Sequence, residues 1–218
     1  MKKAVLIALC FFCFVNFAWG ETDIKELIKK AESGNTEAQI KLGQMYLDGQ
    51  GATKNYAEAM KWIGKAAEKG SAKAQHMLGE IYFVGGPGVP KDYVEAMKWY
   101  RKAADQGDTE AQVKVGFMYD NGEGVAENNV EAMEWYMKAA EQGNSLAQFY
   151  LGIIYKKGQN VPQNYIKAYA WLNIAMASGF EMSREYLDEL SHIMSVQQIA
   201  QAQNEAAELW EKINKSKK

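Results

Sequence analysis

The sequence predicts an all-α fold built from stacked pairs of helices, and three observations lead to this prediction. A unit of 36 or 37 residues occurs four times in the chain of 218 residues, which is the mark of a structural repeat. Each unit holds two segments in which apolar residues recur three and four positions apart, the spacing of one helix face. Glycine followed by a capping residue separates successive units. Each unit should therefore form a helix pair that packs on its neighbours in one elongated domain.

Residues 1–20 have the pattern of a secretory signal peptide. Lys2 and Lys3 precede an apolar run over residues 4–17, and small residues stand at the end of the segment, before Glu21, as in a cleavage site. The apolar run is shorter than the ~20 residues of a spanning helix, although an uncleaved membrane anchor is the alternative. Residues 21–34 then predict an N-terminal capping helix.

The first helix of each unit, helix A, should begin after a glycine and a capping residue. Glycine accepts the left-handed conformation that ends one helix, and the next side chain accepts a hydrogen bond from the free N–H groups that open the following helix. The pairs are Gly34 and Asn35, Gly70 and Ser71, Gly107 and Asp108, and Gly143 and Asn144. They give repeats over residues 35–70, 71–107, 108–143 and 144–179.

The second helix of each unit, helix B, should begin at an asparagine or aspartate. These residues are Asn55, Asp92, Asn128 and Asn164. In three units a glutamate follows three positions later, at Glu58, Glu95 and Glu131. This spacing resembles a capping box, in which two side chains satisfy each other's backbone donors. The repeated glutamates are explained by the helix start, and we assign them no catalytic role.

Apolar stripes on both helices predict the core. In the first unit the stripe of helix A is Ala38, Leu42 and Tyr46, with Gly43 beside it, and related residues recur in the later units. Small residues let a neighbouring helix come close. On helix B the stripe contains one tryptophan per unit, at Trp62, Trp99, Trp135 and Trp171. An indole buries ~150–250 Å², so we expect these four side chains in the core.

Residues 180–218 predict two C-terminal capping helices, at 184–193 and 196–213. Ser195 and Gln198 form a capping-box pair at the start of the second helix. The apolar faces expected to cover the last repeat are Met182, Tyr186, Leu187 and Leu190 on the first helix, and Val196, Ile199, Ala206, Trp210 and Ile213 on the second. Because an array of repeats needs covered ends, these helices should close it.

The composition restricts the chemistry. The formal net charge is −2, and basic residues are spread among acidic ones, which argues against a nucleic-acid surface. Both cysteines, Cys10 and Cys13, lie in the predicted leader, so the exported chain would contain no disulfide. The two histidines, His76 and His192, belong to no HExxH or clustered metal-ligand pattern. We expect no cofactor and no metal.

The units resemble Sel-one-like repeats (SLR), which are relatives of the tetratricopeptide repeats. The pattern AQxxLGxxYxxGxGVPxDYxxAxxWYxKAAxxG is nearly complete in the second and third units, and the resemblance covers residues 35–179. The resemblance implies a right-handed superhelix of antiparallel helix pairs that serves as an adaptor or scaffold. Exported bacterial members of this family look like partners of cell-envelope enzymes or factors used in contact with host cells. We therefore expect a non-catalytic, monomeric, periplasmic or secreted protein that binds a peptide or helix of another exported protein.

In the geometry of tetratricopeptide-like repeats, the A helices line the concave side. One face of these helices, distinct from the apolar stripe, varies among the units and is the expected partner surface. Its members are Ile40, Gln44, His76, Glu80, Phe83, Val113, Phe117, Asp120, Phe149, Ile153 and Lys156. Aromatic and apolar anchors surrounded by charge are typical of binding hot spots. The alternative is that some of these residues pack between neighbouring A helices.

Two other functions are weighed against a binding scaffold. Cysteine-rich members of the Sel-one-like repeat family, which these units resemble, are linked to hydrolysis of β-lactams. A hydrolase acting on a β-lactam or on peptidoglycan is therefore one alternative. Those relatives carry paired cysteines in their repeats, whereas residues 21–218 contain none. Self-assembly into longer scaffolds is the other alternative, and the predicted caps at both ends argue against it.

Overall fold

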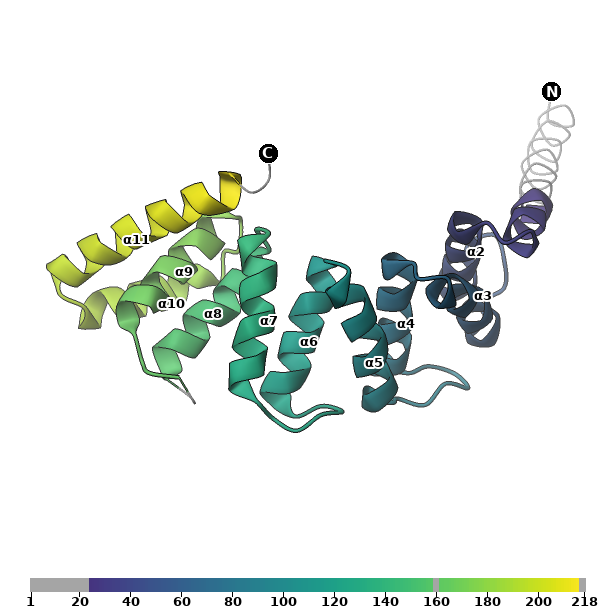
Figure 1. The fold of residues 1–218 in the computed structure, drawn as a ribbon, viewed down its shortest axis with the longest axis horizontal. Coiled ribbons are helices and arrows are strands. Elements are labelled where there is room, and N and C mark those ends of the chain that lie inside the picture. Colours follow the sequence, from purple (N-terminus) through teal and green to yellow (C-terminus); the bar gives the residue numbers. More distant parts are fainter. Residues whose placement is uncertain (1–23, 159–160, 216–218) are drawn as a thin grey trace, which may run out of the picture. The chain divides into compact units, whose positions relative to one another are not determined.

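The structure is a computed structural model that describes residues 24–158 and 161–215, and these residues form helices joined by loops (Figure 1). Two compact units make up the chain, the first ending at Asp92 and the second beginning at Tyr93, and each is described by itself. The boundary falls between the two helices of the second repeat. The predicted signal peptide over residues 1–20 lies outside the described residues.

The first unit contains a helix over residues 24–32, followed by α2 (Thr36–Asp48), α3 (Tyr56–Glu68) and α4 (Ala72–Val84). The second unit contains α5 (Tyr93–Asp105), α6 (Thr109–Asn121), α7 (Asn129–Glu141), α8 (Ser145–Lys157), α9 (Tyr165–Ala177), α10 (Ser183–Ile193) and α11 (Val196–Lys215). The A helices are α2, α4, α6 and α8, and the B helices are α3, α5, α7 and α9. The predicted all-α repeat fold is confirmed.

The helix A starts are capped as predicted. The side-chain oxygens of Asn35, Asp108 and Asn144 accept hydrogen bonds from the backbone N–H three residues later, at 2.8, 2.8 and 3.0 Å. Ser71 caps α4 in the same way. The glycines that precede these caps have φ between 88° and 93°, a conformation that other residues rarely adopt. One helix therefore ends and the next begins within two residues.

The helix B starts are only partly as predicted. Asn55, Asn128 and Asn164 do cap their helices through their side chains. The reciprocal half of the capping box does not form at Asn55, because its backbone N–H donates to the carbonyl of Tyr46 at 2.9 Å. The carboxylate of Glu58 instead accepts from Nε1 of Trp62 at 3.1 Å and pairs with Lys61. In the first repeat the glutamate thus holds the tryptophan in place, which the spacing alone did not indicate.

The glycine in the middle of helix A is required by the helix B of the same repeat. A Cβ atom at Gly116 would lie 2.8 Å from the ring of Tyr136, and one at Gly152 would lie 2.5 Å from Cγ of Leu172. These distances are far below van der Waals contact. In the first, third and fourth repeats, the bulky residue that follows the helix B tryptophan therefore fills the space that the missing glycine side chain leaves, and this brings the two backbones close.

A buried glutamine ties each helix A to the helix that precedes it. The Nε2 atoms of Gln39, Gln75, Gln112 and Gln148 donate to the carbonyls of Ala31, Ala67, Ala104 and Ala140, at 2.9–3.2 Å. All four glutamines are at most 5% exposed. Each carbonyl lies in the last turn of the preceding helix and also accepts the N–H of the following glycine. A buried amide thus uses a backbone acceptor at every junction between repeats.

The tryptophans lie in the core as predicted, with one partial exception. Trp62, Trp135 and Trp171 are buried, whereas Trp99 is half-buried. In the first three repeats a lysine three residues later lies over the indole ring, with Nζ 3.8–4.3 Å from the ring centroid. The lysine stem covers the exposed edge of the ring while its ammonium group stays in water.

The fourth helix B differs because it is covered by more of the protein. Ile174 stands where the earlier repeats have this lysine, and α9 packs against α8, α10 and α11. Ala168, Ala170, Leu172 and Ile174 are all buried, so apolar residues occur on nearly every side of α9. A helix surrounded by protein in this way needs no polar face.

The C-terminal helices close the second unit, with α10 in the place of a further helix A. Ser183 stands four residues after Gly179, where the repeats have alanine, and it is fully buried. The predicted capping box at α11 is confirmed, because Ser195 and Gln198 exchange two hydrogen bonds of 2.9 and 3.2 Å. Lys212 forms a salt bridge of 2.8 Å with Glu141 and so joins α11 to α7.

Three residues expected on the covered faces of these helices are in fact exposed. Met182 is 65% exposed and Val196 is 81% exposed, because they lie just before α10 and at the first position of α11. Trp210 is 38% exposed and borders a shallow groove of about 250 Å³ between α9 and α11. Leu190, Ala206 and Ile213 are buried as expected.

Substitution of two glycines in the first unit distinguishes the effect of packing from the effect of helix propensity. A Cβ on Gly43 would overlap Cγ1 of Ile63, whereas one on Gly64 would meet no atom within 4 Å. We expect Gly43→Ala to lower the free energy of unfolding by about 1–3 kcal/mol through overpacking. Gly64→Ala should raise it by ~0.5–1 kcal/mol, because alanine is the better helix former. Urea unfolding followed by circular dichroism measures both, and equal effects of the two substitutions would contradict the packing argument.

The glutamine contact predicts a second stability change. Gln148→Met keeps most of the side-chain volume but removes the donor to the carbonyl of Ala140, so the free energy of unfolding should fall by about 1–2 kcal/mol. Gln44→Met, at an exposed position on α2, is the control and should change stability by less than ~0.5 kcal/mol. Thermal unfolding of the two variants tests this, and identical curves would show that the buried amide does not stabilise the junction.

Candidate functional site

The first unit carries five of the residues expected to bind a partner, and all five lie at or near its surface. On α2, Ile40 is half-buried, while Gln44 is exposed and donates to the carboxylate of Asp48 at 3.2 Å. On α4, Nε2 of His76 lies 3.7 Å from Oε1 of Glu80, and Phe83 is half-buried. Two of the polar contacts of these side chains, Gln44 with Asp48 and His76 with Glu80, lie within single helices.

Two of the expected partner residues in the second unit belong to the core instead. Val113 is 5% exposed and Phe149 is 8% exposed. The ring of Phe149 lies 4.8 Å from that of Phe180 and 5.4 Å from that of Tyr186, measured between centroids. The prediction that Val113 and Phe149 contact a partner is therefore wrong, because neighbouring helices, including α10 at Phe149, bury them. The alternative of packing between neighbouring A helices holds for both.

Lys156, another of the expected partner residues, has contacts within the protein. Its Nζ forms a salt bridge with Oε2 of Glu189 on α10 and lies 4.9 Å from the centroid of the Tyr186 ring. The side chain is 19% exposed. Lys156 therefore anchors the C-terminal cap to α8, and its charge is already used within the protein.

The remaining residues of this face in the second unit include a half-buried carboxylate. Phe117 and Asp120 on α6 and Ile153 on α8 are half-buried. Among the described residues, none donates a hydrogen bond to the carboxylate of Asp120 or forms a salt bridge with it. Burial raises the pKa of this carboxyl above its usual range, Lys157 opposes the shift and Glu127 adds to it.

Two tyrosines lie beside this carboxylate. Tyr136 reaches from α7 to Gly116 of α6, and its ring stacks on that of Tyr150 of α8 with centroids 4.8 Å apart. The Tyr136 hydroxyl is buried, and no described residue forms a hydrogen bond with it. Burial, followed by the charge of Asp120, raises the pKa of both tyrosines. The site is therefore an acidic group in a partly dehydrated, aromatic setting.

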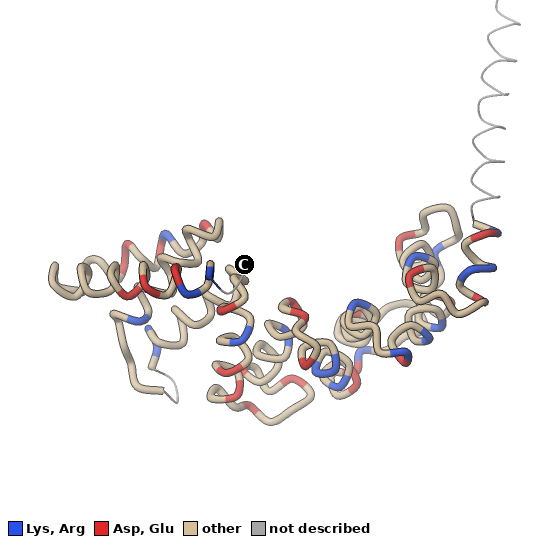
Figure 2. Tube along the Cα trace, turned by 45° about the horizontal axis from the view of Figure 1, so that its top comes forward, with Lys and Arg blue, Asp and Glu red and all other residues tan. Residues whose placement is uncertain are grey.

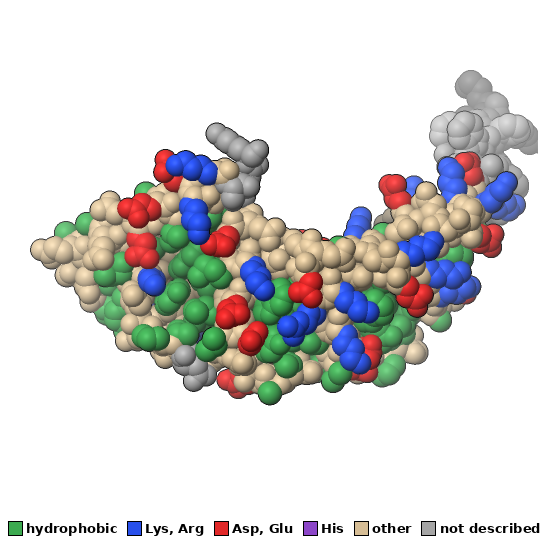
Figure 3. Space-filling view, in the orientation of Figure 1, with side chains coloured by type: hydrophobic (Ala, Val, Ile, Leu, Met, Phe, Trp, Pro, Cys, Tyr) green, Lys and Arg blue, Asp and Glu red, His purple; other side chains and the backbone are tan. Residues whose placement is uncertain are grey.

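Charges of both signs are mixed over the described surface. Figure 2 shows basic and acidic residues interspersed along each unit, and Figure 3 shows hydrophobic side chains between the charged ones on the visible face. Such a surface offers no extended basic track for nucleic acid. Among the helices that the structure describes, none has the length and hydrophobicity needed to cross a membrane.

The histidines have local contacts. His76 lies near Glu80 on the same helix, and Nδ1 of His192 lies 2.7 Å from the carbonyl oxygen of Asp188 on α10. Within the described part of the chain, no group of three or more histidine, cysteine, aspartate and glutamate side chains is arranged to hold a metal ion.

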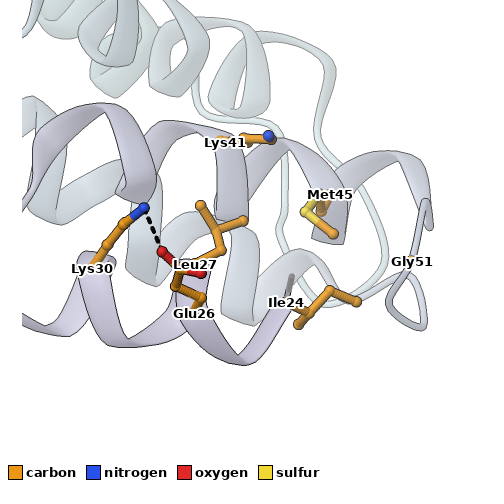
Figure 4. Close-up of a pocket in the computed structure, with 7 residues that line it drawn as sticks. All are labelled: Ile24, Glu26, Leu27, Lys30, Lys41, Met45 and Gly51. Atoms are coloured by element: carbon orange, nitrogen blue, oxygen red, sulfur yellow. Dashed lines mark ion pairs between the residues drawn. The ribbon is translucent and has the colours of Figure 1, made fainter. Parts of the chain in front are cut away.

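A separate cavity of about 480 Å³ lies in the first unit (Figure 4). Ile24, Leu27 and Met45 form its apolar wall, and Lys41 stands at its rim. Glu26 and Lys30, which also line it, form an exposed ion pair of 2.8 Å, and this lowers the pKa of Glu26. The charged residues that line this cavity are either paired with each other or exposed to water, so its described lining does not suggest a catalytic site.

Sequence reasoning missed the contributions of Tyr150 and Glu189 to this face. Tyr150 stands seven residues after Gly143, and the same position in the other A helices carries Lys41, Met77 and Lys114. Extending the repeat numbering past Gly179 would have identified α10 as a helix A and placed Glu189 opposite Lys156. The signal was present in the period, but the divergent sequence of α10 concealed it.

Comparisons with known proteins agree with this architecture. The sequence profile of the Sel1 repeat matches residues 36–71, 72–108, 109–144 and 145–180. A crystal structure of a Sel1 repeat protein from Oxalobacter formigenes is 31% identical, with a TM-score of 0.72 over 90% of this chain and 80% of that chain. A protective antigen of uropathogenic Escherichia coli that displays an SLR fold is 28% identical, with a TM-score of 0.54 over 87% of this chain and 50% of that one.

One curated relative is similar over a shorter stretch. The secretory immunoglobulin A-binding protein EsiB of Escherichia coli is 38% identical over 69 residues, which are 30% of this chain but only 14% of the relative. The chain thus matches a small part of that longer protein. Four matched repeats, which together cover more than half of the chain, and their helix pairs show that this protein belongs to the Sel1 repeat family.

Proposed function

We propose that this protein is a non-catalytic adaptor that binds a peptide or helix of another exported protein on the face formed by its A helices. One observation carries the proposal: a repeated framework presents different side chains at one surface position. Thirteen residues after the glycine that opens each repeat, the A helices carry Leu47, Phe83, Asp120 and Lys156. The framework alanines and the central glycine stay the same in all four repeats.

The character of the face supports binding to a protein. Phe83 in the first unit and Phe117 in the second are half-buried aromatic residues with polar or charged neighbours. Partly exposed aromatic side chains offer contact area at a low cost in conformational entropy, which is why they are frequent in binding hot spots. The name of the Escherichia coli relative, an immunoglobulin A-binding protein, is consistent with binding by repeats of this kind.

The capture of a partner tests this function. Phe117→Ser should abolish crosslinking to the partner in envelope or secreted fractions, because it removes an apolar anchor from the A-helix face. Val130→Ser, at an exposed position on α7, is the control and should leave crosslinking unchanged. Phe83→Ser repeats the test in the first unit. Equal capture by all variants would contradict the proposed face, and unfolding of Phe117→Ser would assign Phe117 to the core.

Export is a separate part of the proposal and rests on the leader-like residues 1–20. We expect the protein in a periplasmic or secreted fraction, with Glu21 as its first residue and no membrane insertion after cleavage. The intact mass of the protein recovered from fractionated cells checks this. A mass that includes residues 1–20, in a membrane fraction, would instead indicate an uncleaved anchor.

A further inference from the structure

Comparison of the last two A-helix junctions shows a charge without its counterpart. Lys156 stands thirteen residues after Gly143, and its partner Glu189 stands ten residues after Gly179, in the next helix A. The equivalent residues one repeat earlier are Asp120 and Ile153. By repeat position, the residue of α8 that corresponds to Glu189 is therefore an isoleucine, so the repeat pattern provides no cation for Asp120 at this position.

The aromatic residue beside the charge is the same at both junctions. Tyr186 and Tyr150 each stand seven residues after the glycine that opens their helix, and Lys156 lies 4.9 Å from the centroid of the Tyr186 ring. Asp120 acts electrostatically on Tyr150 and on the buried hydroxyl of Tyr136, which has no hydrogen-bond partner among the described residues. The second junction thus contains a closed ion pair, whereas at the first the carboxylate of Asp120 is opposed only by the charge of Lys157, with which it forms no salt bridge.

We propose that the carboxylate of Asp120 binds a basic side chain, arginine or lysine, of the partner, beside the ring of Tyr150 and the side chain of Ile153. This inference rests on the proposed function and specifies the chemistry of the partner segment. A carboxylate that is partly removed from water forms stronger charge-assisted hydrogen bonds than an exposed one. A guanidinium group can also stack on an aromatic ring while it pairs with the acid.

The half-buried position of Asp120 disfavours the ionised form of its carboxyl in the free protein. Burial raises the pKa of Asp120, so the folded state binds its proton more tightly than the unfolded state. Stability therefore falls as the pH rises from the unfolded pKa through the folded pKa, and the ionised group is unfavourable at neutral pH. Asp120→Asn should melt at the same temperature as the unchanged protein or higher, which separates loss of binding from loss of fold.

A titration with a small cationic probe tests the site without knowledge of the natural partner. N-acetyl-arginine amide is added to the full-length ¹⁵N-labelled chain, and amide shifts are followed by NMR, with N-acetyl-citrulline amide as the neutral probe of matched shape. We expect saturable shifts around Asp120, Tyr150 and Ile153 with the arginine probe, and about tenfold weaker binding for citrulline and for Asp120→Asn.

A second variant installs the missing partner within the chain. Ile153→Lys places an ammonium group where Glu189 meets Lys156, so it should satisfy Asp120 internally and weaken binding of the arginine probe about tenfold. Ile153→Met is the uncharged control and should bind as the unchanged protein does. Absence of saturable shifts, equal binding of citrulline, or unchanged binding by Asp120→Asn or Ile153→Lys would overturn the cation site. The adaptor function would stand in that case if Phe117→Ser still abolished capture of a partner.

Discussion

The close contact between a helix A glycine and the bulky residue of helix B is the constraint on which the helix pairs of the first, third and fourth repeats depend. Because Gly116 and Gly152 have no side chain, the ring of Tyr136 and the branched side chain of Leu172 can lie directly against the A-helix backbone. This contact sets how closely the two helices approach. The buried glutamine then sets how one pair follows the next, through a hydrogen bond to the last turn of the preceding helix. One contact within the repeat and one between repeats are enough to propagate the array.

The surface of helix B shows how the same frame is adapted to its surroundings. Where helix B faces water, as in α7, a lysine covers the tryptophan ring and keeps its charge in solvent. Where the C-terminal helices cover it, as in α9, an isoleucine replaces the lysine and the helix becomes apolar on nearly all sides. The change from Lys138 to Ile174 is therefore a consequence of capping rather than of ligand binding.

The surface of helix A differs from that of helix B, because some of its residues pack within the array while others are available to a proposed partner. At the fourth repeat, α10 covers Phe149 and engages Lys156, so that part of the face serves the end of the array. At the third repeat, Asp120 occupies the equivalent position, where the charge of Lys157 acts on it but no described residue forms a salt bridge with it. A fixed backbone with a changeable side chain at one position allows each junction to be closed by the protein or left for a partner. The proposed adaptor role and the cation site both follow from this arrangement.

The sequence by itself determined the fold class, the helix starts and the burial of most tryptophans, because these depend on local spacing and on residues that act within one or two turns. Asn35 caps α2 and Ser195 caps α11 as their sequence neighbours predict. Only the tertiary structure decided that Phe149 is core, that Lys156 is paired and that Glu58 holds Trp62 rather than the backbone of Asn55. Each of these outcomes depends on which groups compete for the same space or the same hydrogen bond. The partners of Phe149 and Lys156 lie about thirty residues further along the chain. The acceptor that displaces Glu58 is the carbonyl oxygen of Tyr46, which the loop between α2 and α3 brings to the N–H of Asn55.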